Sequence, residues 1–173
     1  MTKKYLGQLL TLKFEYSNET IEYSGYLIDY NDKWVLLKYN KVDYEVDGYI
    51  ILSNKYVTAF KRDDKEKFTQ KILDLKGYKP KDKERIPITD LNTILTYLTD
   101  KFGIFQFNMK VDKTSWLGSV KNISGSDLVI DYLTPRGTWT KTMPPFKLGN
   151  IRTIEFDTNY INSLKLIASK RPR

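Results

Sequence analysis

The start of the chain alternates apolar and polar side chains with the period of a β-strand. Between residues 10 and 16 every second position is apolar, which is typical of a half-buried strand. Similar short segments follow, each bounded by turn-forming residues, at 21–29, 34–39, 48–52 and 57–61. Gly25 interrupts the second segment and permits a sharp bend there. Five short strands with a bent second strand predict a small closed barrel.

The segment 25–39 recurs at 118–132 without a gap. A glycine begins both copies, a tyrosine closes both, and apolar runs occupy the same places between them. A gapless internal match indicates a duplicated folding unit. The second module is therefore expected to repeat the strands of the first, at 105–111, 116–123, 128–133, 138–143 and 152–156.

A helix is predicted directly after the first module. Phe68, Ile72 and Leu75 have the spacing of one helical face, and Asp63 and Glu66 have the spacing of a capping box. We expect this helix to cover an open end of the first barrel, because a barrel this small buries little by itself. Two further helices are expected, at 91–102 and 160–168.

Two residue types that are absent from the sequence limit the chemistry of the protein. The chain contains no cysteine and no histidine, which excludes disulfides, Ser–His hydrolysis and the common zinc sites. No glycine-rich phosphate loop or nucleophile elbow occurs. Asp29, Asp32 and Asp43 are the first acids to consider for catalysis, but no pattern brings them to one point. We expect a non-catalytic protein without a cofactor.

The spacing of Asp43, Glu45 and Asp47 before Gly48 invites comparison with a calcium loop. A glutamate is expected at the twelfth position of such a loop, and Asn54 stands there instead. Alternating acids of this kind also keep a strand edge soluble and unpaired. We therefore expect no metal site.

The net charge of +8 is unevenly distributed. Acidic and basic residues balance over the first 70 positions, so the basic excess lies in the second half and in the tail. A basic surface attracts phosphates, which keeps nucleic acid among the candidate partners. The chain has neither an apolar leader nor an apolar run of about 20 residues, so we expect a cytoplasmic protein that does not bind membranes.

Part of the first module resembles the first conserved motif of Sm-like proteins, in particular the bacterial Sm-like RNA chaperone. The residues that carry the similarity are Gly25, Leu27, Tyr30, Asn31, Val35, Leu36, Leu37 and Lys38. In that family an aromatic and an amide side chain near this turn contact RNA bases, which the resemblance assigns to Tyr30 and Asn31. Taken whole, the chain also resembles a group of bacterial tandem small-barrel proteins, whose pattern pairs the element at 43–49 with a glycine-bent barrel and a late aspartate before a closing helix. This resemblance implies a fold and no particular activity.

These patterns predict a mainly β protein with accessory helices. We expect two tandem five-stranded Sm/SH3-like small barrels, each followed by a helix. The first barrel and its closing helix should occupy residues 1–76, and a linker with two prolines residues 77–90. Residues 91–173 should hold a helix, the second barrel, its closing helix and the basic tail.

Aromatic side chains are the main candidates for binding, because tyrosine is enriched at protein interfaces. The candidate binding residues are Tyr26, Tyr30, Asn31, Tyr44 and Tyr49, and the candidate phosphate contacts are Lys79, Lys81, Lys83 and Arg85. We expect recognition of a protein partner through the tyrosine-rich wall or an exposed edge strand of the first barrel. The alternative is RNA or single-stranded nucleic-acid binding, with Tyr26 and Tyr30 stacking on bases.

Overall fold

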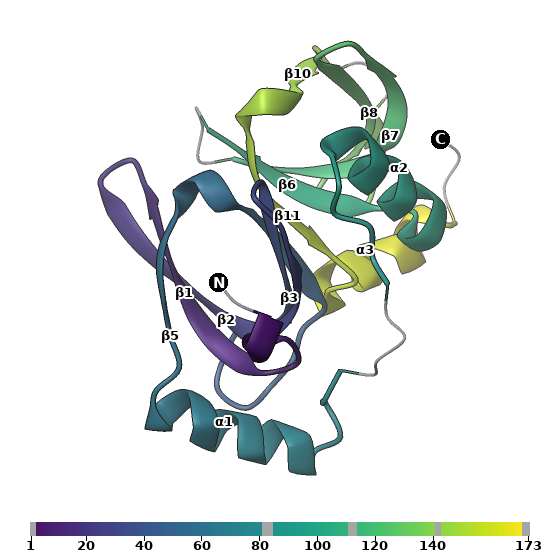
Figure 1. Ribbon diagram of the computed structural model, residues 1–173. Coiled ribbons are helices and arrows are strands. Elements are labelled where there is room, and N and C mark those ends of the chain that lie inside the picture. Colours follow the sequence, from purple (N-terminus) through teal and green to yellow (C-terminus); the bar gives the residue numbers. More distant parts are fainter. Residues whose placement is uncertain (1–2, 81–84, 111–113, 141–142, 171–173) are drawn as a thin grey trace. The chain divides into compact units, whose positions relative to one another are not determined.

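The computed structural model describes residues 3–80, 85–110, 114–140 and 143–170. The chain divides into two units, Met1–Ile88 and Thr89–Arg173. Each unit is an antiparallel β-sheet with helices (Figure 1). No helix within the described ranges is long and apolar enough to span a lipid bilayer.

Unit 1 contains five strands and one α-helix. Its elements are a 3-10 helix Lys3–Tyr5, β1 Leu9–Tyr16, β2 Glu19–Tyr30, β3 Trp34–Asn40, β4 Tyr49–Ser53, a 3-10 helix Asn54–Tyr56, β5 Val57–Lys61 and α1 Asp64–Leu75. The strands pair in the order β4-β3-β2-β1-β5. The last strand therefore returns to pair with the first, not with its neighbour in sequence.

Unit 2 repeats this strand order. Its elements are α2 Leu91–Phe102, β6 Phe105–Met109, β7 Ser115–Ser124, β8 Asp127–Leu133, β9 Trp139–Thr140, β10 Phe146–Lys147, a 3-10 helix Leu148–Asn150, β11 Ile151–Phe156 and α3 Asn159–Ala168. The strands pair in the order β10-β8-β7-β6-β11, and β9 also pairs with β8.

The fourth strand of unit 2 differs from the expectation. In place of one strand at 138–143, the structure has the short strands β9 and β10, and residues 141 and 142 lie outside the described residues. Pro144 and Pro145 separate the two strands, and proline has no N–H to contribute to a ladder.

The mainly β fold with accessory helices is confirmed, whereas barrel closure is not. In unit 1 the strands at the two ends of the pairing order are β4 and β5, and no pairing between their residues is present in the described part of the chain. The sheet is therefore open.

The same irregularity recurs in the second hairpin of each unit. The register of β2 against β3 shifts between Leu27 and Asp29, and that of β7 against β8 shifts between Val120 and Asn122. These positions are 93 residues apart, as are the ends of β3 and β8. A bulge increases the local twist of a strand pair, so both copies of the repeat encode a bent hairpin.

The core of unit 1 lies on one face of its strands. The buried apolar side chains there include Leu10, Leu12, Phe14, Leu27, Val35, Leu37, Ile50 and Leu52. β1 is unusual because Leu9 and Thr11, which alternate with the core residues, are buried as well. They lie on the outer face of the sheet, where α1 covers β1.

The helix α2 forms as its sequence predicts. Asp90 caps its start by accepting a hydrogen bond from the Thr93 N–H at 3.0 Å, which satisfies a donor left free at a helix N-terminus. The apolar side chains Ile94, Leu95 and Leu98 are fully buried.

The helix α1 begins as predicted but presents a different face. The Asp63 N–H donates to Glu66 Oε2 at 2.9 Å within the predicted capping box. The expected packing face is wrong, because Phe68 and Leu75 are 58% and 82% exposed, whereas Glu66 and Leu73 are buried. Polar side chains on the buried face hydrogen-bond to the sheet and orient the helix in this way.

Gly25 and Gly118 lie where two strands approach most closely. A Cβ atom at Gly25 would overlap the backbone carbonyl oxygen of Lys38, and one at Gly118 would overlap that of Asp131. A backbone oxygen cannot move aside as a flexible side chain can, so the bend requires glycine at both positions.

We predict that Gly25→Ala lowers the free energy of unfolding by about 1–3 kcal/mol, the usual cost of overpacking. Urea denaturation followed by circular dichroism measures this effect. Gly149→Ala is the control, because no atom lies within 4 Å of the added Cβ and its φ is not left-handed. Equal stability of the two variants would contradict the close-approach argument.

Candidate binding site

Three polar side chains, one helical turn apart, attach α1 to the sheet. They are Glu66, Gln70 and Asp74. Gln70 Oε1 accepts a hydrogen bond from the Leu9 N–H at 3.0 Å, and Asp74 Oδ1 accepts one from the Tyr26 hydroxyl at 2.7 Å. Burial, and next the hydrogen bond to Asp74, raise the pKa of the Tyr26 hydroxyl. The hydroxyl therefore remains protonated and keeps this bond over the ordinary pH range.

Glu66 is a buried carboxylate that links the helix start to the sheet. Its Oε1 accepts from the Thr11 hydroxyl at 2.9 Å, and its Oε2 accepts from the Asp63 N–H. Burial alone would raise the pKa of this carboxyl, but the hydrogen bonds outweigh burial and hold the pKa below its ordinary value. Because Thr11 donates to Glu66, its 2.7 Å contact with Ser24 must be donated by the Ser24 hydroxyl.

The loop between β3 and β4 is organised by Asn40. The Asn40 side-chain amide donates to the carbonyl oxygens of Val42, Asp43 and Glu45, at 3.4, 2.9 and 2.7 Å. Asp43 takes a left-handed φ of 42°, a conformation that Asn and Asp tolerate better than most residues. A buried amide thus holds a loop in which residues 41–45 are exposed, while Val46 packs against the buried cluster of Leu9, Tyr26 and Leu73.

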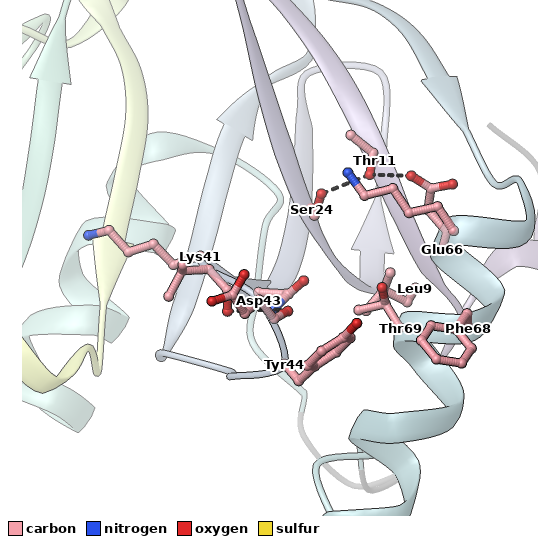
Figure 2. Close-up of a pocket in the computed structure, with 12 residues that line it drawn as sticks. Leu9, Thr11, Ser24, Lys41, Asp43, Tyr44, Glu66, Phe68 and Thr69 are labelled. Carbon is pink, nitrogen blue, oxygen red and sulfur yellow. Dashed lines mark hydrogen bonds between the residues drawn. The ribbon is translucent and has the colours of Figure 1, made fainter.

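This loop and α1 enclose a pocket of about 290 Å³. The residues that line it are Leu9, Thr11, Ser24, Asn40, Lys41, Val42, Asp43, Tyr44, Lys65, Glu66, Phe68 and Thr69. Figure 2 shows the hydrogen-bonded chain of Ser24, Thr11 and Glu66 at one end of this pocket. We call this hollow the loop–helix pocket.

Two contacts tie the loop to the helix. The rings of Tyr44 and Phe68 meet edge to face, with centroids 6.3 Å apart (Figure 2). The Lys76 ammonium donates to the Tyr44 carbonyl oxygen at 2.7 Å. Tyr44 is 40% exposed and Val42 is 58% exposed, so the rim of the pocket offers apolar surface from both the loop and the helix.

The apolar surface continues along α1. Phe68, half-buried Ile72 and Leu75 follow one another on the outward face, and we call these three residues the α1 stripe. Exposed apolar side chains that gather on one face are typical of surfaces that contact a partner. The α1 stripe and the loop–helix pocket together form the candidate binding site.

The structure places two of the predicted tyrosines inside unit 1. Tyr26 is fully buried beneath α1, in a cluster with Leu9 and Leu73. Tyr49 is also buried, and the Lys38 ammonium lies 5.9 Å from its ring centroid. Neither ring is therefore on the surface, and α1 covers Tyr26. Of the predicted tyrosines, Tyr44 lies in the candidate site.

Tyr30 is the last residue of β2, and Asn31 begins the turn that leads into β3. Tyr30 packs partly buried against the core of unit 1. Asn31 uses its side chain within the turn, where Oδ1 accepts from the N–H groups of Lys33 and Trp34, both at 2.8 Å. Its Nδ2 donates to the Ile88 carbonyl oxygen at 2.7 Å. These bonds stabilise the turn and occupy the amide.

The predicted phosphate contacts are only partly described. Lys79 and Arg85 are exposed, whereas Lys81 and Lys83 lie outside the described residues. In the described ranges, no group of three or more acids is arranged to hold a metal ion. Comparison of the chain with protein-family models, curated proteins and solved structures gave no significant match.

The exposed apolar residues of α1 were missed as binding residues at the level of sequence. Their spacing suits a core-facing stripe equally well, so apolar periodicity alone could not assign them to the surface. The available signal was the opposite face, where Glu66, Gln70 and Asp74 also recur at helical spacing. A helix packs its polar face against a sheet when buried donors of the strands need hydrogen-bond acceptors.

We predict that Glu66→Gln lowers stability at neutral pH by about 1.5–3 kcal/mol, because it removes hydrogen bonds to a charged group. A depressed pKa stabilises the fold fully above the ordinary carboxyl pKa, and the stabilisation is lost as the pH falls through the folded-state pKa. The difference in the free energy of unfolding between the parent protein and the variant should therefore become smaller at acidic pH. Urea denaturation at several pH values measures it, with the exposed Glu15→Gln as control.

A second prediction concerns the loop. Asn40→Asp places a carboxylate against three carbonyl oxygens, so the loop should open and the protein should lose about 1–3 kcal/mol of stability. Limited proteolysis within residues 41–48, together with urea denaturation, measures both effects. The exposed Asn122→Asp should change neither. An Asn40→Asp protein with an equally resistant loop would show that the amide does not organise it.

Proposed function

We propose that unit 1 is a non-catalytic protein-recognition module that docks its partner on the α1 stripe and the loop–helix pocket. The observation that carries this proposal is the outward-facing α1 stripe, where Leu75 is 82% exposed. Protein grooves commonly receive apolar side chains displayed on one helical face. Binding would bury such side chains and recover about 25 cal/mol per Å² of apolar area.

The neighbouring pocket supports recognition of a protein surface. Hot spots of interfaces combine aromatic anchors with a hollow that excludes water, and Tyr44 and Phe68 stand at the rim of such a hollow. The hydrogen-bonded chain of Ser24, Thr11 and Glu66 forms one fixed end of this hollow.

A protein partner is favoured over nucleic acid by the position of the residues that base stacking would need. Tyr26 is buried, Tyr30 is packed against the core, and the amide of Asn31 is occupied within its turn. Base recognition requires open aromatic faces and available amide groups.

We also propose that each unit is a variant of the Sm/SH3-like small barrel. Three features support this proposal: the strand order shared by the two units, the bulge at matching positions, and the glycine at each bend. In this view the barrel is a scaffold, and the following helix supplies the binding surface.

Photocrosslinking in cells tests the docking face. We predict that a benzophenone amino acid placed at Phe68 in the full chain yields discrete crosslinked products that are sensitive to protease and resistant to nuclease. The same probe at Leu166 on α3 is the matched control, because Leu166 is also an exposed apolar helix residue, at 69%. The products should disappear when Leu75→Ser is added.

Two outcomes would contradict the proposal. Products that form equally from Phe68 and Leu166 would mean that the α1 stripe has no preferred partner. Products that nuclease removes would assign unit 1 to nucleic-acid binding instead.

A further inference from the structure

We infer that the partner segment is an acidic amphipathic peptide, which lays apolar side chains on the α1 stripe and directs carboxylates to the lysines beside it. This inference rests on the proposed function and adds the chemistry of the partner. It follows from the distribution of charge around the α1 stripe.

Lysines border the α1 stripe on both sides. At 100° per residue, Lys65 and Lys76 fall on one side of the apolar positions, and Lys67 and Lys71 fall on the other. All four are exposed. Lys67 pairs with Asp64 at 3.1 Å, but an exposed ion pair of this kind is weak and exchanges readily.

A shallow depression of about 410 Å³ lies along the side of α1 that carries Lys67 and Lys71. The residues that line it are Arg62, Lys67, Gln70, Lys71, Asp74 and Leu75. It contains three cationic side chains and one carboxylate, and that carboxylate already accepts the hydrogen bond of Tyr26. The depression is therefore a basic hollow that begins at the exposed end of the α1 stripe.

One side of this hollow is held rigid by Arg62. Its Nε donates to Gln8 Oε1, and its Nη1 donates to the Leu9 carbonyl oxygen, both at 2.6 Å. A fixed guanidinium loses little conformational entropy when a carboxylate approaches. The hollow is thus preorganised for an anionic side chain beside an apolar one.

Charge also disfavours a second copy of α1 as the occupant. Two copies of this face would bring lysine borders together, and like charges across an interface are unfavourable. A lipid surface fits less well, because three apolar side chains bury little area in a bilayer and stable anchoring takes more.

The test uses the full chain and two fluorescein-labelled synthetic peptides. One carries Leu and Phe on one helical face and Glu on the other, and its partner has Lys at every Glu position. Fluorescence anisotropy should show binding of the acidic peptide only, weakening as salt is raised. The double variant Lys67→Glu with Lys71→Glu should weaken binding about tenfold.

The control double variant is Lys101→Glu with Lys121→Glu, which makes the same change in net charge at exposed positions of α2 and β7. It should leave acidic-peptide binding unchanged. The variant Phe68→Ser with Leu75→Ser should abolish it, and circular dichroism shows that each variant is folded.

The outcomes separate this inference from the proposed function. If Phe68 crosslinks to protein but the acidic peptide fails to bind, or binds no better than the basic one, the acidic partner is overturned while protein recognition stands. If phosphatidylserine vesicles or a single-stranded oligonucleotide bind through Lys67 and Lys71 and the acidic peptide does not, the site is a lipid or nucleic-acid site. If Phe68 gives no crosslink and no peptide binds, both proposals fail.

Discussion

Hydrogen bonding between one face of α1 and the sheet determines which face of α1 is exposed to solvent. Glu66, Gln70 and Asp74 each satisfy a donor on β1 or β2 that α1 would otherwise bury without a partner. An unsatisfied buried polar group costs about 1–3 kcal/mol, and turning the apolar face of α1 inward would leave three such groups without partners, which offsets the gain from burying that face. The α1 stripe is exposed as a consequence of this balance.

The two units use the same hairpin but attach the helix that follows the sheet differently. Tyr26 hydrogen-bonds to Asp74 on α1, whereas the corresponding residue of the repeat is Ser119, a small side chain that is fully buried. In unit 2, α3 packs through apolar side chains, with Ile161 and Ala168 in the core cluster. One duplicated sheet thus supports an apolar attachment in unit 2 and a polar attachment in unit 1.

Local patterns predicted the strands of unit 1 and the glycine bends, because alternation, turns and close backbone approach are encoded in neighbouring residues. The orientation of α1 was not predictable in this way. Its apolar and polar faces both have helical spacing, and the choice depends on Thr11 and Tyr26, which are distant in sequence. Tyr26 was misplaced for the same reason: alternation shows which residues share a face, but not whether a helix covers that face.

The lysine borders give the exposed stripe two properties at once. In the free protein, exposed lysines keep an apolar surface soluble and disfavour pairing between identical copies. During binding, the same charges attract an acidic segment over about 8 Å at physiological salt and disfavour basic competitors. Apolar contact then stabilises the complex at short range, where Phe68 and Leu75 are exposed. Because the two effects act at different distances, raising salt should slow association of an acidic partner more than it speeds dissociation.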